Sequence, residues 1–201
     1  MTLPPFAVTF DYRCPFARNA HEYLVAGLRD GAGWDVTFLP FSLSQAHVPE
    51  GGAPVWDDPE KAGDLTALAA GLVVRDRHPD RFLAVHRGLF GARHDEGRDL
   101  RDREVVRAVL AANGVPPDEV FEQIDGGAPV AELARLHEHA VAEHQVFGVP
   151  TFILDGRAVF IRLTTRPDGR SGEARATIER LVRLMIDEPG LNEFKFTTIG
   201  N

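Results

Sequence analysis

The sequence predicts a mixed α/β protein in which a block of helices is inserted between a βαβ half and a ββα half. Three observations support this fold class: a strand, helix and strand pattern opens the chain, a hairpin and a helix close it, and helical patterns fill the middle. The 201 residues, 44% hydrophobic and 26% charged, are enough for one or two folded domains. No internal repeat or low-complexity tract stands out, so we expect one compact fold with an insertion.

The opening half follows from two short apolar runs that flank a helical pattern. Phe6–Phe10 (FAVTF) and Trp34–Phe41 (WDVTFLPF) are rich in β-branched and aromatic residues, which favours strands. Between them, Pro15–Arg29 carries apolar residues at helical spacing and is followed by Asp30-Gly31, a common helix end. A strand, helix and strand in this order predicts a parallel pair with a right-handed crossover.

The closing half begins with a hairpin. The apolar runs Thr151–Leu154 and Ala158–Ile161 flank Asp155-Gly156, a dipeptide that adopts the positive φ values of a tight turn. Apolar residues then recur at helical spacing from Glu173 to Ile186. The final stretch EFKFTTI, residues 193–199, alternates like a strand and fits equally a tail packed on the surface.

The middle of the chain is predicted to be helical. Five segments have helical patterns, with a Gly-Val-Pro-Pro-Asp stretch before the fourth: Leu65–Val74, Asp80–Phe90, Asp102–Ala112, Asp118–Ile124 and Pro129–Gln145. We therefore divide the chain into a discontinuous α/β domain, residues 1–58 and 146–201, and a helical insertion, residues 59–145.

Composition argues against two classes of partner. The net charge of −8 disfavours binding to a phosphate backbone, so we expect no nucleic-acid partner. No run approaches the roughly 20 apolar residues of a membrane span, and the N-terminal MTLPPFAVTFDYR lacks a secretory signal pattern. We expect a cytoplasmic protein without a membrane partner. The abundance of alanine, with Lys61 and Lys195 as the only lysines, is typical of a high-GC bacterial genome.

Cys14 is the strongest candidate for a reactive group. It is the sole cysteine, so it forms no intramolecular disulfide. It follows the first predicted strand and precedes Pro15, which suits the first turn of a helix. The helix dipole and unpaired N–H groups there favour a thiolate, Arg13 offers a cationic neighbour, and a lowered thiol pKa is expected. The alternative is a small, inert core residue.

A second motif lies just before the predicted hairpin. Pro150 in the stretch FGVPTF precedes an apolar strand and cannot donate a hydrogen bond to a strand ladder. A Val-Pro bond at such a turn can be cis, which would leave the neighbouring backbone open to a ligand. Taken alone, the motif favours the alternative, a trans proline that simply begins the strand.

Together, FDYRCPFA and FGVPTFIL resemble the active-site turn and the cis-proline loop of the DsbA family within the thioredoxin superfamily. The resemblance covers nearly the whole chain and implies a thioredoxin-like fold with a helical insertion. Within the family, the chain resembles FrnE-like proteins and the mycothiol-dependent nitroreductases of actinobacteria. One departure matters: the family motif Cys-Pro-X-Cys is replaced by a CPFA turn, in which Ala17 stands where the second cysteine would be.

The resemblance implies a cytoplasmic thiol-disulfide oxidoreductase with Cys14 as its nucleophile. Because Ala17 cannot resolve a mixed disulfide, an external thiol must do so, which gives a monothiol mechanism. No tightly bound cofactor is expected. Mycothiol or glutathione is the expected co-substrate. The expected partner of the protein is a small-molecule thiol or disulfide substrate. Val149 and Pro150 would bind the ligand through the backbone, while Phe16 and Trp56 would wall the cleft.

Two alternatives to this function remain open, and so does the oligomeric state. Relatives with a single nucleophile include kappa-class glutathione transferases and chromene-carboxylate isomerases, so a thiol-dependent transferase or isomerase fits the same residues. A binding module without turnover is the other alternative. We expect no metal site, because His137, Glu138 and His144 have unsuitable spacing. The relatives suggest a homodimer.

Overall fold

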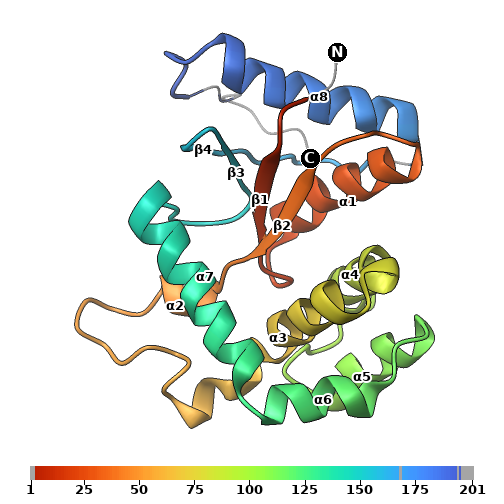
Figure 1. Cartoon of the computed structure of the whole chain (residues 1–201), viewed down its shortest axis with the longest axis vertical. Helices are drawn as coiled ribbons and strands as arrows, with labels where there is room; N and C mark the ends of the chain where they lie inside the picture. The colour runs from red at the N-terminus through yellow and green to blue at the C-terminus, as the bar shows by residue number, and fades with distance from the viewer. Residues whose placement is uncertain (1–2, 168, 194, 196–201) are drawn as a thin grey trace.

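The computed structural model describes residues 3–167, 169–193 and 195. It contains a four-stranded sheet in the order β2-β1-β3-β4, which confirms the predicted α/β class (Figure 1). β1 (Phe6–Phe10) is parallel to β2 (Val36–Pro40) and antiparallel to β3 (Thr151–Leu154). β4 (Arg157–Phe160) completes the sheet as the antiparallel partner of β3.

β1 and β3 are the two inner strands of the sheet, and the ring of Phe6 in β1 stacks on that of Phe152 in β3 with centroids 6.3 Å apart. β2 is at the edge, where Pro40 is tolerated because the sheet requires no hydrogen bond from its nitrogen. The strand is shorter than the predicted Trp34–Phe41 because Trp34 lies before it, with its ring against Gly27.

Two helices pack against one another beside the sheet (Figure 1). α1 (Pro15–Arg29) is the predicted crossover between β1 and β2, and its C-terminal turn reaches Gly31, whose φ of +81° glycine adopts readily. α8 (Ser171–Asp187) extends the predicted closing helix by a few residues at its start. Ile178 and Val182 of α8 are fully buried.

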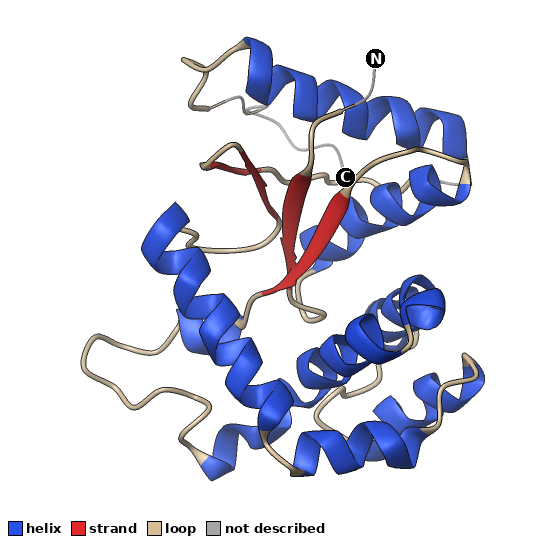
Figure 2. Ribbon diagram, in the orientation of Figure 1, coloured by secondary structure: helices blue, strands red, loops and turns tan. Residues whose placement is uncertain are grey.

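The insertion forms a separate group of helices below the sheet in the view of Figure 2. All five predicted helices are present, with bounds that differ by up to four residues: α3 (Ala62–Arg77), α4 (Pro79–His94), α5 (Arg103–Ala112), α6 (Pro117–Asp125) and α7 (Ala128–His144). α3 is central, because it contacts each of the other four. Towards the α/β half, α4 contacts α1 and α7 contacts β2.

Two short helices were missed by the sequence patterns. α2 (Leu43–Ala46) and the 3-10 helix η1 (Pro59–Lys61) are each a single turn, too short to show a periodicity. Apart from residues 193 and 195, the predicted strand or tail at 193–199 lies outside the described residues. None of the described helices is both long enough and apolar enough to cross a membrane.

Candidate active site

Cys14 lies where β1 gives way to α1. It is the N-cap residue of α1, and its Sγ accepts a hydrogen bond from the Ala17 N–H at 3.4 Å. Its own N–H donates to the Asp11 carbonyl at 3.0 Å, which closes the turn, and Pro15 occupies the first helical position. The sulfur therefore lies at a helix N-terminus.

The loop before β3 faces this sulfur. The Cys14 thiol donates to the carbonyl oxygen of Val149, with the two heavy atoms 3.4 Å apart. The Val149–Pro150 peptide bond is cis, and the Pro150 carbonyl accepts from the Ile161 N–H at 3.1 Å. Two motifs that are 135 residues apart in the chain thus meet at one point.

Thr9 of β1 fixes the position of this loop. Its Oγ1 accepts a hydrogen bond from the Thr151 N–H at 2.8 Å, and both threonines are buried. The Thr151 hydroxyl in turn donates to the Gly148 carbonyl at 2.8 Å. Because these bonds lie in the interior, where an unpaired group is costly, they hold Val149 and Pro150 against the thiol turn.

The structure contradicts the predicted lowering of the Cys14 pKa. Only 8% of Cys14 is exposed, and this burial raises the thiol pKa above its usual value. The N–H groups of Ala17 and Phe16 act in the opposite direction, as expected at a helix start, but with smaller effect. The prediction was wrong because the helix N-terminus could be inferred locally, whereas the cover supplied by Val149 could not.

Arg13 does not provide the cationic neighbour. Its guanidinium forms ion pairs with Asp11 at 3.1 Å and with Asp64 of α3 at 3.7 Å. The positive charge that lowers the Cys14 pKa comes instead from Arg162, whose guanidinium carbon lies 5.3 Å from the centre of the Phe16 ring.

Sequence reasoning missed Arg162, although the hairpin contains the necessary signal. The turn at Asp155-Gly156 pairs Leu154 with Arg157 and Thr151 with Phe160. Continuing this register places residue 162 beside Val149, and the hydrogen bond from Ile161 to Pro150 shows that the register does continue.

The predicted site residues divide into one assembled group and two that lie elsewhere. Arg13 pairs with acidic side chains instead of the sulfur, as described above. Trp56 packs edge-on against His137 of α7, with ring centres 5.7 Å apart. The contact found for Trp56 is therefore with the insertion, not with the thiol turn. The assembled group comprises Cys14, Pro15, Phe16, Ala17, Val149 and Pro150.

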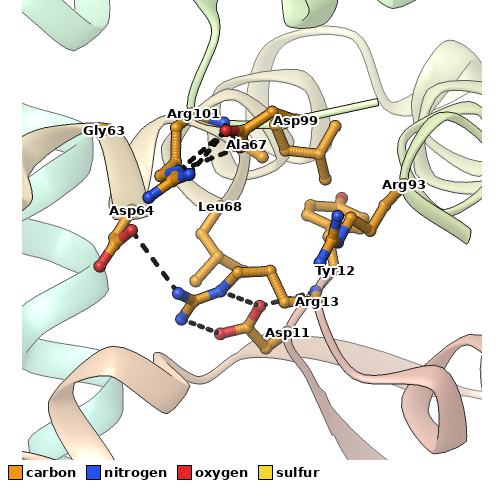
Figure 3. Close-up of a pocket in the computed structure, with 11 residues that line it drawn as sticks. Asp11, Tyr12, Arg13, Gly63, Asp64, Ala67, Leu68, Arg93, Asp99 and Arg101 are labelled. Atoms are coloured by element: carbon orange, nitrogen blue, oxygen red, sulfur yellow. Dashed lines mark hydrogen bonds and ion pairs between the residues drawn. The ribbon is translucent and has the colours of Figure 1, made fainter. Parts of the chain in front are cut away.

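A cavity of about 340 Å³ opens beside the turn, between it and the insertion (Figure 3). Its lining balances three acidic side chains, Asp11, Asp64 and Asp99, with three basic ones, Arg13, Arg93 and Arg101. Arg13 pairs with Asp11 and Asp64, and Arg101 pairs with Asp99 at 2.8 Å. Because opposite charges are paired across its wall, this cavity offers a polar space with little net charge.

His137 of the insertion is held by packing and by a hydrogen bond. His137 stacks on Phe41 with ring centres 4.1 Å apart, and its Nδ1 accepts from the Ser42 N–H. Within the described part of the chain, no group of three or more His, Cys, Asp or Glu side chains is placed to hold a metal ion.

This arrangement of a helix-capping cysteine facing a cis-proline loop agrees with a comparison of family profiles. The profile for the DSBA-like thioredoxin domain matches residues 7–165, which include both motifs and the whole insertion. The chain belongs to the DSBA-like thioredoxin domain family. No curated protein sequence gives a significant match.

Solved structures show the same fold for this DSBA-like chain. The cytosolic disulfide reductase DsbM from Pseudomonas aeruginosa, solved with GSH, is 20% identical with a TM-score of 0.62, covering 90% of this chain and 100% of its own. A 2-hydroxychromene-2-carboxylate isomerase is 17% identical with a TM-score of 0.61, covering 92% and 98%. A variant of P. aeruginosa DsbA is 20% identical with a TM-score of 0.56, covering 94% of each chain. At these identities the likeness supports the fold alone.

Proposed function

We propose that this DSBA-like protein is a cytoplasmic thiol-disulfide oxidoreductase that acts through Cys14 by a monothiol mechanism. The observation that carries the proposal is the contact between the Cys14 sulfur and Val149, in a turn where Ala17 replaces the second cysteine. Within the family we propose a place beside FrnE-like proteins and mycothiol-dependent nitroreductases, from whose turn the CPFA turn of this chain departs at Ala17.

The proposed cycle has two exchange steps. The Cys14 thiol first leaves the Val149 carbonyl and loses its proton to solvent. The thiolate then attacks one sulfur of a disulfide RSSR, which forms a Cys14–S–S–R mixed disulfide and releases the other half as a thiolate. An external thiolate R′S⁻ then attacks the R sulfur of the mixed disulfide. This step forms the disulfide R′SSR and releases Cys14 as a thiolate. Ala17 has no sulfur, so no step is intramolecular.

The surroundings of Cys14 favour an extended, anionic ligand. Val149 lies next to the cis Pro150, and its backbone is positioned to pair with a peptide-like thiol once the Cys14 contact opens. Arg162 provides a positive charge beside Phe16 that also acts on Cys14. Glutathione carries carboxylates, whereas mycothiol has no comparable charge, so we propose glutathione as the first co-substrate to test. The GSH-bound DsbM structure supports this choice.

The test is mass spectrometry of the intact protein after incubation with oxidised glutathione and, separately, oxidised mycothiol. We expect one glutathione per chain, absent from Cys14→Ser and removed by added free thiol. Failure of both disulfides to form any adduct with folded protein would overturn the proposal.

A second candidate is a thiol-dependent isomerase or transferase. The raised pKa of Cys14 favours it, because a thiol that stays protonated could orient a bound glutathione without exchanging with it. The isomerase among the structural neighbours supports the same alternative. Glutathione-dependent consumption of a small electrophile by Cys14→Ser as well as by the parent protein would favour this candidate. Saturable glutathione binding without either reaction would indicate a binding module.

The proposed cellular location and oligomeric state are each tested by a separate measurement. The cytosolic DsbM neighbour supports a cytoplasmic location, which fractionation of the source cells would check. A homodimer, suggested by the family resemblance, predicts twice the mass of the 22.1 kDa chain in light scattering, and a monomeric mass would contradict it.

A further inference from the structure

Two histidines lie in the apolar core between the sheet and the insertion. His86 of α4 is fully buried and His21 of α1 is 1% exposed. Aromatic rings surround them: the centre of the His86 ring lies 4.7 Å from that of Phe10 and 5.0 Å from that of Phe90. No step of the proposed cycle uses either imidazole, although each could take up a proton.

These side chains form a continuous hydrogen-bonded chain with Tyr12. The Tyr12 hydroxyl lies 3.0 Å from His86 Nδ1, and His86 Nε2 lies 2.9 Å from His21 Nδ1. His21 Nε2 lies 3.1 Å from the Thr9 carbonyl oxygen. The chain therefore runs from the thiol turn through α4 and α1 to β1.

The direction of every proton in this chain follows from its last acceptor. The Thr9 carbonyl can only accept, so the Nε2–H of His21 donates to it. Burial lowers the pKa of His21 to about 4, so the ring is neutral and its Nδ1 accepts from His86 Nε2–H. His86 Nδ1 then accepts from the Tyr12 hydroxyl. Only one arrangement of protons satisfies all three bonds with neutral rings.

Both ends of the chain reach residues that build the thiol site. Tyr12 is two residues before Cys14, and its carbonyl also accepts from the Nε2–H of His94 at 2.9 Å. At the other end, the Oγ1 of Thr9 holds the Thr151 N–H beside the cis-proline loop. His86 and His94, both on α4, thus bind Tyr12 through its side chain and its backbone.

We propose that Tyr12 and His86 are positioning residues, through which α4 of the insertion holds the Cys14 turn closed against Val149. The proposal rests on the proposed function only in taking Cys14 as the reactive group. Opening of the Cys14 to Val149 contact would then depend on whether the buried chain is intact.

Packing alone does not account for this arrangement. A pair of aliphatic side chains would fill the same space without polar groups to satisfy. The polar chain is favourable only when each member has its partner, because an unpaired donor or acceptor in this interior is destabilising. It therefore stabilises one geometry of the turn over others of similar packing.

The first test is nitrogen NMR of the histidine rings at neutral pH. We expect His21 and His86 to be neutral, each with its proton on Nε2, and slow exchange of both protons with water. A charged ring, or a proton on Nδ1 of either histidine, would overturn the proposed chain.

The second test compares Tyr12→Phe with Tyr23→Phe. The first change removes only the buried hydroxyl, whereas Tyr23 donates to the Arg166 carbonyl near the surface and provides a matched control. We expect iodoacetamide to alkylate Cys14 about tenfold faster in Tyr12→Phe, because one lost buried hydrogen bond eases opening of the turn. Tyr23→Phe should match the parent protein. Equal rates in Tyr12→Phe and Tyr23→Phe would refute a positioning role.

A third variant separates bonding from packing at α4. His86→Gln retains an amide acceptor and donor, so it should restore part of the slow alkylation that His86→Leu loses. Equal rates for folded His86→Gln and His86→Leu would contradict the proposal. Alkylation requires no disulfide substrate, so absence of a glutathione adduct would refute the proposed function without touching this inference.

Discussion

The sulfur of Cys14 lies 3.4 Å from the carbonyl oxygen of Val149, and it donates its proton there. A thiolate would face a partial negative charge in the same place, so this geometry favours the protonated thiol. Exchange chemistry thus requires a small movement, in which the sulfur or the loop gives up this contact.

Replacing Ala17 with cysteine should convert the monothiol site into a dithiol site. The Ala17 side chain is fully buried one helical turn after Cys14, and its N–H bonds to the Cys14 sulfur, so a second sulfur there would be close enough to react. We expect Ala17→Cys to lose both free thiols on mild oxidation through a disulfide within each chain, with no disulfide between chains. A thiol count that stays at two would contradict the assigned geometry.

Arg162 should determine the preference for charged disulfides. In the parent protein, Cys14 should react faster with dithiodipropionate, which is anionic, than with cystamine, which is cationic, and the neutral hydroxyethyl disulfide should lie between them. Arg162→Gln should reduce or abolish this order. Arg135→Gln, an exposed change on α7, is the control and should retain it. The same order in both variants would exclude Arg162 as the cause.

The hydroxyl of Thr9 should stabilise the cis-proline loop. Thr9→Val keeps the shape but removes the acceptor for the Thr151 N–H, which should lower the free energy of unfolding by about 1–3 kcal/mol. Urea unfolding would measure the change. Thr165→Val, at an exposed position, should have a much smaller effect.

Stability should fall as the pH decreases from about 6.5 towards 4. Burial lowers the pKa of His137 to about 4, as it does for His21. Below pH 6.5 the unfolded chain gains protons that the folded chain excludes, so each of these histidines removes about 1.4 kcal/mol per pH unit. Urea unfolding across this range should show that the free energy of unfolding changes less with pH in His137→Gln than in the parent protein. An equal change with pH in the two proteins would contradict this assignment.

Helices and strands could be predicted where the sequence pattern that marks them lies within the element itself. FAVTF, the Asp155-Gly156 turn and the long helical patterns each contain their own periodicity or turn residues, so the fold class and most boundaries followed from the sequence. The single turns α2 and η1 are too short for such a signal.

The site was predictable only in part, because its chemistry depends on long-range packing. The motif around Cys14 indicated a helix N-terminus, and the observed cap agrees. Its burial, and therefore the direction of its pKa, depends on long-range packing that brings Val149, 135 residues away, against the sulfur. The polar chain through Tyr12, His86 and His21 also joins three separate elements, and no spacing in the sequence reveals it.

The two-residue link between β3 and β4 has an evolutionary consequence. Side chains alternate between the faces of a strand, so a one-residue insertion or deletion at Asp155-Gly156 that shifts the β3–β4 register by one would turn the Arg162 guanidinium to the opposite face. Such a change would leave the residues of the thiol turn and of the cis-proline loop unaltered in sequence. Homologues could therefore switch their selectivity for charged ligands by altering loop length alone, without a single substitution near the nucleophile.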